Sequence, residues 1–399
     1  MPKFDASKLL YNEFEKNRFI NELEVEAGHI EFMRSARTKV RNKLKSAFTQ
    51  AKSSDLYLSR MDEAEQTVFK NIEPRFWPQG SFAYGTQNVP AQIPPQQLDI
   101  DDGVYLPIEA LRERPIVNKQ IFFDIVDSAL QDLAHDEGWA FVAKETCARL
   151  ELDWMTHLDV PLYAIPVDRF EGLQKAVGRV AFNEQYLDAD DEQNMMRKLA
   201  EQEVYLAVRS NTHWKKSDPI RIQAWFEQEQ ELFGERLTRV CRYFKAWRDH
   251  CWGKGGPSSI ALMICVWEVF SESARPFQTD SEAIHAVCKQ LPNKLKQGVL
   301  NPVAEEETVF PRDLNTNEHD SIVSVAAIFC GDVVDVLDVG SSPELVVEKF
   351  SAHWGSRLPQ RPDWVELANV AAAGVVKSTP ASPQVKPKIG TLRSAYRSG

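Results

Sequence analysis

The chain has 399 residues, of which 43% are hydrophobic and 26% charged, and its formal net charge is −11. This length exceeds what one hydrophobic core usually serves, so we expect two lobes. The acidic balance argues against a long nucleic-acid partner, although small nucleotides remain compatible with it. No apolar run approaches the ~20 residues of a membrane span, and no signal-peptide pattern is seen. The six cysteines are dispersed and form no C-x-x-C pair, so a reduced, cytoplasmic protein without a zinc site is expected.

Apolar residues at helical spacing predict helices through residues 6–70, and the clearest of them covers 30–51. Basic side chains crowd this helix. They form either a solvated basic face or a pocket for an anionic ligand that faces the segment 74–77. The basic residues are Arg34, Arg37, Lys39, Arg41 and Lys43.

A Gly-Ser turn follows, in the run Gln-Gly-Ser-Phe-Ala-Tyr-Gly-Thr over residues 79–86. Gly80 and Ser81 can cradle an anionic phosphate with backbone N–H groups and a hydroxyl. Three prolines then predict a loop before the next strand. They are Pro90, Pro94 and Pro95.

Paired aspartates lie on the strand expected to end near residue 107. Asp99 and Asp101 are two residues apart, so their side chains share one face of a strand while Asp102 points to the other. Two carboxylates on one face can hold one or two Mg²⁺ ions. Such a metal clamp suits in-line displacement at phosphorus. Asp159, in a later strand-like run, is the candidate third carboxylate.

The remaining elements follow from periodicity and from chain-breaking residues. We expect a helix over 118–135, strands over 139–152 and 157–165, a polar insertion over 168–218 with one helix near 192–201, helical segments over 220–251, 260–269 and 281–291, an irregular acidic segment over 301–320, and helices over 322–337 and 343–350. The glycine-rich break at 253–259 lacks the spacing of a Walker loop, and Ser258 or Ser259 can cap the next helix. The basic, proline-containing tail from residue 374 is expected to be disordered.

The motif over residues 74–82, followed by that over 99–103, resembles the bacterial cGAS/DncV-like nucleotidyltransferases, and among them the dinucleotide cyclases that make 3′,3′-cyclic GMP-AMP. The likeness spans roughly residues 30–310. It continues through 146–149, 157–166, 217–219, 240–249 and 255–259. The resemblance implies an α+β fold with a polymerase-β-like nucleotidyltransferase core of mixed sheet and helices, joined to a C-terminal helical lobe with the active site in the cleft. The expected parts are the core with N-terminal helices over 1–216, the helical lobe over 217–373 and the tail over 374–399.

The resemblance also implies roles for individual residues. Asp99, Asp101 and Asp159 would be the catalytic metal ligands, for Mg²⁺ or Mn²⁺. The nucleotide-binding residues would be Gln79, Gly80, Ser81, Tyr84, Arg149, Ser217, Lys245, Ser259 and Glu306. An inhibitory folate-like ligand would occupy a pocket formed by Arg37, Arg41, Arg75, Phe76 and Trp77. The terminal Gly399 resembles the site that a ubiquitin-transfer-like ancillary enzyme joins to another protein.

Several of these residues have a structural alternative. Arg149 could instead pair with Glu151, Lys245 could be an ordinary exposed lysine, and Tyr84 could belong to the core. His157 is expected to pack beside the strand end rather than to act as a ligand or base.

The function implied is a monomeric cyclic dinucleotide synthase that uses ATP and GTP in antiphage signalling. One alternative is a template-free transferase that makes linear or other cyclic oligonucleotides. Another is a catalytically idle scaffold that only binds nucleotides.

Overall fold

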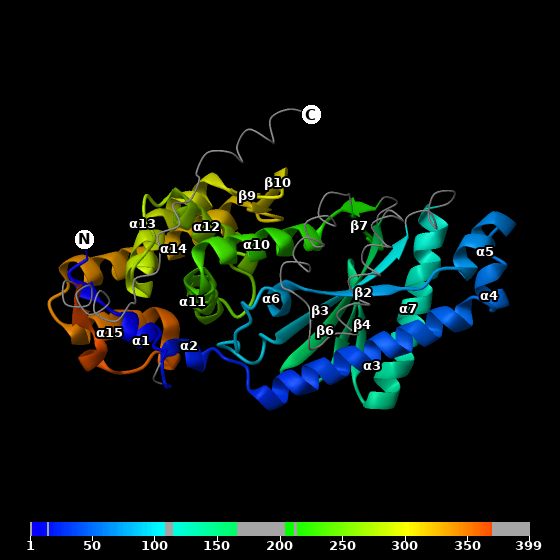
Figure 1. The fold of residues 1–399 in the computed structure, drawn as a ribbon, viewed down its shortest axis with the longest axis horizontal. Coiled ribbons are helices and arrows are strands. Elements are labelled where there is room, and N and C mark those ends of the chain that lie inside the picture. The colour runs from blue at the N-terminus through cyan, green and yellow to red at the C-terminus, as the bar shows by residue number, and fades with distance from the viewer. Residues whose placement is uncertain (1, 14–15, 108–114, 166–203, 211–213, 369–399) are drawn as a thin grey trace.

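The computed structural model describes residues 2–13, 16–107, 115–165, 204–210 and 214–368. The helix expected near 192–201 and the tail with Gly399 lie outside the described residues. Figure 1 shows an elongated molecule with a sheet-containing lobe at one end and a helical lobe at the other. In the part that is described, no helix combines the length and apolarity that crossing a membrane requires. The two-lobed α+β architecture expected from the sequence is confirmed.

A mixed sheet forms the centre of the first lobe. Its strands run in the spatial order β2-β3-β6-β5-β4, with a short extension from β6 through β7 to β8. The neighbours β3 and β6 are parallel, and the other pairs are antiparallel. The strands are β2 (Arg75–Gln79), β3 (Leu98–Pro107), β4 (Ala140–Ala143), β5 (Cys147–Glu151), β6 (Thr156–Ile165), β7 (Tyr205–Leu206) and β8 (Lys215–Lys216). The stretch expected as one strand over 139–152 is therefore the hairpin β4–β5.

Two long helices, α3 (Ala27–Ala51) and α7 (Pro115–Glu137), cover one face of this sheet. Alternate residues of β3, such as Leu98 and Ile100, are buried in the core that these helices form with the sheet. Strand alternation therefore places the Asp99 and Asp101 side chains on the opposite face of the sheet. Asp102 points to the helix side as expected.

The second lobe is built from helices, and its own hydrophobic cluster is separate from that of the sheet. Its helices are α10 (Pro219–Phe233), α11 (Glu235–Cys251), α12 (Ser259–Glu272), α13 (Asp280–Gln297), α14 (Thr316–Val339) and α15 (Pro343–Trp354). The helical segment expected over 220–251 is two helices, because Gly234 between them has a φ of 73°, a left-handed conformation that ends α10.

The expectation of an irregular segment over 301–320 is wrong. The strands β9 (Val299–Asn301) and β10 (Ala304–Phe310) form an antiparallel hairpin there. The first part of β10 is polar, and its side chains Glu306 and Thr308 face solvent. Composition therefore hid the strands.

The chain's first elements belong to the helical lobe, whereas the sequence placed them in the first lobe. β1 (Phe4–Asp5) pairs with β11 (Glu366–Leu367), so the two ends of the described chain lie side by side. The short helices α1 (Ser7–Leu10) and α2 (Phe19–Glu22) bury their apolar residues in the cluster of α11 and α13. Only α3 and the short α4 (Asp55–Leu58) and α5 (Glu63–Lys70) remain with the sheet.

Candidate active site

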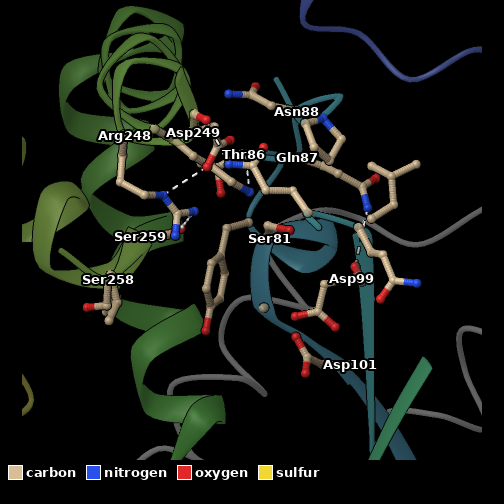
Figure 2. A pocket seen from close by; sticks show the side chains of 18 of the residues that line it. Ser81, Thr86, Gln87, Asn88, Asp99, Asp101, Arg248, Asp249, Ser258 and Ser259 are labelled. Carbon is tan, nitrogen blue, oxygen red and sulfur yellow. Dashed lines mark hydrogen bonds and ion pairs between the residues drawn. The ribbon is translucent and has the colours of Figure 1, made fainter. Parts of the chain in front are cut away.

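A cleft of about 560 Å³ lies between the two lobes, a size typical of small-molecule sites. One wall is formed by the short helix α6 (Gly80–Ala83), the loop after it and strands β3, β5 and β6, and the other by α11 and α12. Figure 2 shows Asp99 and Asp101 on one side of this cleft and Arg248 and Ser259 on the other. Of the residues predicted to bind nucleotides, those that line the cleft are Gly80, Ser81, Tyr84, Arg149, Lys245 and Ser259.

The turn after β2 is built around a close approach between Gly80 and Asp101. Gly80 has a φ of 69°, a left-handed conformation that side chains rarely adopt. A Cβ at this position would lie 2.2 Å from Asp101 Oδ2. Glycine thus lets the turn pack directly against the carboxylate, and the next residue, Ser81, lines the cleft.

Gln79, which precedes this turn, does not line the cleft. Its amide donates to the Tyr105 hydroxyl at 2.6 Å and accepts from the Tyr163 hydroxyl at 3.1 Å, and the residue is only 6% exposed. A Cβ on Gly103 would lie 2.2 Å from Gln79 Nε2, so glycine there makes room for this network. Gln79 is therefore placed to support the turn from behind and not to contact a nucleotide directly.

The charged residues of the sheet form two rows across three neighbouring strands. In one row, Asp101 is next to Asp159 on β6, which is next to Arg149 on β5. Arg149 donates two hydrogen bonds of 2.7 Å to the two carboxylate oxygens of Asp159. Burial opposes the charge of Arg149, yet the bond to Asp159 and its negative charge raise the pKa of the guanidinium. Arg149 therefore pairs with the third aspartate and not with Glu151.

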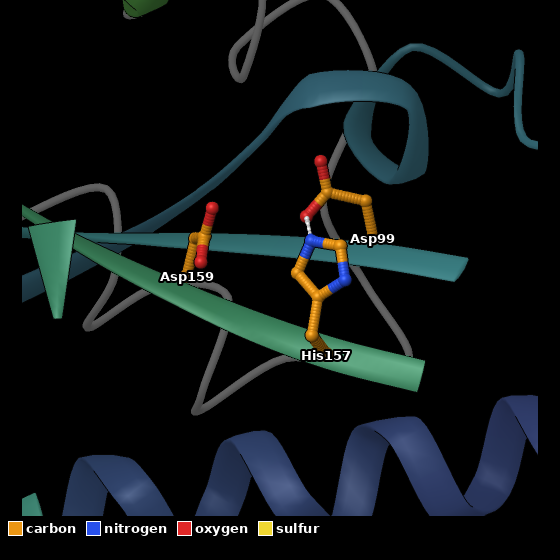
Figure 3. A group of neighbouring side chains, drawn as sticks. All are labelled: Asp99, His157 and Asp159. Carbon is orange, nitrogen blue, oxygen red and sulfur yellow. Dashed lines mark ion pairs between the residues drawn. The ribbon is translucent and has the colours of Figure 1, made fainter. Parts of the chain in front are cut away.

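In the other row, Asp99 is next to His157, which is next to Glu151. One potential ligand atom from each of Asp99, His157 and Asp159 lies within 4.8 Å of those of the other two. Figure 3 shows the three side chains as one group. The sequence did not assign His157 to the site. The available signal was its position two residues before Asp159 on a strand, which places both side chains on one face.

The three carboxylates repel one another in the absence of a cation. Burial, together with the charges of Asp99 and Asp159, raises the pKa of Asp101 well above its ordinary value. Asp99 Oδ1 is buried and accepts no hydrogen bond. Hard carboxylate oxygens with unbalanced charge are the donor set that a divalent cation prefers, so these residues fit a metal site.

The opposite wall carries positive charge. Burial lowers the pKa of Lys245 to about 8, although the nearby carboxylates of Asp249 and Asp99 favour its charged form. Its Nζ lies 3.4 Å from the Thr86 carbonyl oxygen. Arg248, which the sequence did not single out, donates to Ser259 Oγ at 3.0 Å. These groups can contact the phosphates or bases of a bound nucleotide.

Of the two serines considered as caps, Ser258 caps α12 by accepting from the Ala261 N–H, which leaves the Ser259 hydroxyl available to the cleft. Tyr84 lines the cleft but also packs edge-on against Phe226, with ring centroids 6.1 Å apart. Burial raises the pKa of the Tyr84 hydroxyl.

Two predicted nucleotide contacts do not line this cleft. Ser217 precedes α10 and donates its backbone N–H to the Val204 carbonyl. Glu306 is exposed on β10. In this arrangement neither residue contributes to the wall that the aspartates form.

A loop between the Gly-Ser turn and β3 ties the two walls together. The Gln96 amide donates at 2.7 Å to two backbone carbonyls at the end of α11, those of Asp249 and Trp252. Asn88 and Arg242 exchange a further pair of hydrogen bonds of 2.9 Å. The strand that carries the aspartates is therefore held against the helix that carries Lys245.

The five residues predicted to bind a folate-like ligand do not share one face of the sheet. Phe76 belongs to the core under α3, where the Arg41 guanidinium lies 5.7 Å from its ring. Trp77, the next residue, points to the other face and donates to Gln223 at 2.9 Å. Arg75 lies beside Glu73.

Two of the basic residues of α3 contact other side chains of the protein. Arg41 donates to both oxygens of buried Asp102, at 2.6 and 2.5 Å. Arg37 lies over the Phe82 ring at 5.2 Å. The interpretation as a purely solvated basic face therefore does not hold for Arg37 and Arg41.

Comparisons with known proteins agree with this geometry. The family described as "Cyclic GMP-AMP synthase DncV-like, nucleotidyltransferase domain" matches residues 74–163, and "Cyclic GMP-AMP synthase, C-terminal domain" matches residues 234–365. A cyclic GMP-AMP synthase of Vibrio cholerae is 32% identical over 309 residues, which cover 75% of this chain and 71% of the relative. One of Escherichia coli is 30% identical over 335 residues, covering 81% and 77%.

Solved structures of the Vibrio cholerae enzyme DncV are similar over nearly the whole chain. The complex with the linear intermediate 5′-pppA(3′,5′)pG has a TM-score of 0.75 at 27% identity, covering 92% of this chain and all of the other. The complex with GTP and 5MTHFGLU2 has a TM-score of 0.74 at 26% identity, with the same coverage. The chain is thus a nucleotidyltransferase, and it belongs to the cyclic GMP-AMP synthase DncV-like family.

Proposed function

We propose that this protein is a cyclic dinucleotide synthase that joins ATP and GTP into 3′,3′-cyclic GMP-AMP and releases pyrophosphate. The observation that carries the proposal is the cleft itself, where Asp99 and Asp101 of β3 face Lys245 and Arg248 of α11. The relatives that align over most of their length are named for this reaction.

In this proposal the Gly-Ser turn and the cationic wall hold the triphosphates. The Ser81 hydroxyl and the Lys245 ammonium provide a donor and a charge for phosphate oxygens. Asp99, Asp101 and Asp159 would hold a divalent cation, Mg²⁺ or Mn²⁺. When bound, the cation supplies positive charge to the phosphate and makes the attacking 3′-hydroxyl more acidic.

The protein's own contribution is positioning. The two-point bond from Arg149 holds the Asp159 carboxylate in one orientation. The hydrogen bonds from Gln96 to the end of α11 hold the two walls of the cleft in a fixed relative position. Catalysis then depends on orientation and charge rather than on a covalent intermediate.

Product analysis tests the proposal. Purified protein with the four ribonucleoside triphosphates and Mg²⁺ should form a cyclic species containing A and G that a nuclease specific for 3′–5′ linkages degrades. The double variant Asp99→Asn/Asp101→Asn should fold normally and form none. Linear products would favour the alternative of a template-free transferase. Nucleotide binding without any product would favour the catalytically idle scaffold.

Two further roles belong to the same proposal. We propose that a folate-like ligand inhibits the enzyme from the far side of the sheet, since a similar structure is a complex with GTP and 5MTHFGLU2. Arg37→Ala should then weaken inhibition by 5MTHFGLU2 and leave uninhibited turnover unchanged. Unchanged inhibition in this variant would remove Arg37 from the site.

We also propose that the protein is a cytoplasmic monomer that acts in antiphage defence and that Gly399 is conjugated to another protein by a ubiquitin-transfer-like enzyme. Deletion of Gly399 should abolish a conjugate seen in cells. Persistence of the conjugate would refute the conjugation of Gly399. The role in antiphage defence is tested separately: cells lacking the gene should lose resistance to phage.

A further inference from the structure

His157 lies in the middle of the row that Asp99 and Glu151 complete, and it is 8% exposed. In the register of the sheet its neighbours are Asp99 on β3 and Glu151 on β5. A histidine buried in such a place needs a defined partner for each ring nitrogen.

The partner of Nδ1 is the side chain of Gln97, with Nδ1 and Gln97 Oε1 3.1 Å apart. The Gln97 amide nitrogen donates to a carboxylate oxygen of Glu151 at 2.9 Å. A carboxylate only accepts hydrogen bonds, so Glu151 fixes the orientation of the amide and turns its oxygen toward the histidine. Nδ1 is therefore the nitrogen that carries a proton.

Nε2, the other nitrogen, points at the aspartates. It lies 3.0 Å from Asp99 Oδ1, yet the contact lacks the geometry of a hydrogen bond, and neither atom has a hydrogen-bond partner. Figure 3 shows the ring beside Asp99, with Asp159 across from it. With the proton on Nδ1, a neutral ring turns the Nε2 lone pair toward this carboxylate oxygen, and two lone pairs 3.0 Å apart are stabilised by a cation that both can bind.

We propose that His157 is a nitrogen ligand of the active-site metal and that it makes this site bind Mn²⁺ in preference to Mg²⁺. The inference rests on the proposed metal role of Asp99 and Asp159. Imidazole nitrogen favours transition metals, whereas Mg²⁺ favours oxygen ligands alone. Ligand atoms around an octahedral ion with bonds of about 2.1 Å lie roughly 3 to 4.2 Å apart, so the donor atoms within 4.8 Å need only small shifts.

Gln97 and Glu151 are then positioning residues for this ligand. A metal-bound histidine almost always donates its other N–H to an acceptor that fixes the ring. Here the acceptor is an amide oxygen, itself oriented by a carboxylate.

The helical lobe offers a contrasting aspartate–histidine pair. His353 Nε2 forms a hydrogen bond of 2.9 Å with Asp332, whose other oxygen is bound by Lys349 at 3.1 Å. This carboxylate already has its cation, and the pair is not part of a metal-ligand group among the residues that the structure describes. His353 therefore provides the matched control.

The test uses nucleotide-free, full-length protein and the metal ions alone. Titration followed by electron paramagnetic resonance should show that Mn²⁺ binds more tightly than Mg²⁺, which is measured by competition. Pulsed electron paramagnetic resonance should detect a coordinated ¹⁴N nucleus in the wild type, a result that needs no variant. His157→Gln should lose this signal and about tenfold in Mn²⁺ affinity, with a change in Mg²⁺ affinity below about twofold.

Gln97→Leu should weaken Mn²⁺ binding on the order of tenfold while the ¹⁴N signal becomes weaker or heterogeneous. His353→Gln should change neither quantity. Absence of the ¹⁴N signal in Mn²⁺-loaded wild-type protein would refute the inference, as would an equal loss of Mg²⁺ and Mn²⁺ affinity in His157→Gln. Failure of the wild type to bind either ion would refute the metal role of the aspartates as well.

Discussion

Replacing Gly80 with alanine should have two effects, a conformational cost to stability and a steric displacement of the Asp101 carboxylate. The first is conformational: the φ of 69° costs an alanine about 1–2 kcal/mol. The second is steric: the new Cβ would lie 2.2 Å from Asp101 Oδ2, so the carboxylate must move by more than about 1 Å. A displacement of this size at a catalytic group can cost on the order of 10²-fold in rate.

Gly85 is the matched control. Its φ is 68°, and a Cβ there would meet nothing within 4 Å. Gly85→Ala should therefore lose the same 1–2 kcal/mol of stability, roughly, but keep its turnover.

The assay compares the two variants by thermal unfolding and by the rate of pyrophosphate release under saturating nucleotide. We expect similar losses of stability and a rate for Gly80→Ala that is about 10² times lower than that of Gly85→Ala. Rates within twofold of each other would refute the argument that this glycine exists to admit Asp101.

Three other perturbations follow from the same site. Arg149→Lys keeps the charge but loses the two-point bond to Asp159, so turnover should fall by about 10²-fold in a fold unchanged by circular dichroism; unchanged turnover would contradict the positioning role. Because burial lowers the pKa of Lys245 from 10.5 to about 8, its charge disappears as the pH rises above 8, and the KM for nucleotides should increase there. The folded protein binds fewer protons than the unfolded chain between these two values, so stability should rise with pH in the same window, and Lys245→Arg should remove both effects. Asp101→Asn relieves repulsion among the three carboxylates, so it should raise the Tm of the metal-free protein by a few degrees while abolishing turnover; a lowered Tm would show that the repulsion is compensated.

Local pattern was a good guide wherever the neighbours of a residue are close in sequence. Alternation along one strand was enough to separate Asp99 and Asp101 from Asp102, and the structure confirms the two faces. The same rule applied to β6 would have placed His157 beside Asp159. Helical periodicity likewise found α3, α7 and most of the second lobe.

Pairing between distant segments was not visible in this way. The bond between Arg149 and Asp159 depends on the register of two antiparallel strands, and strand registers are decided by the whole sheet. The hairpin of β9 and β10 was missed because it is short and the first part of β10 is polar, although Val299, Val309 and Phe310 are buried.

The sequence by itself therefore determined the class of fold, the two faces of the aspartate strand and the family, because these depend on side-chain periodicity and on local motifs. Only the tertiary structure decided that the first helices join the helical lobe, that Gln79 is buried behind the turn, and that His157 directs Nε2 at the Asp99 carboxylate. The physical reason is that burial and hydrogen-bond partners are properties of surfaces brought together across the chain, and no local pattern encodes which surfaces meet.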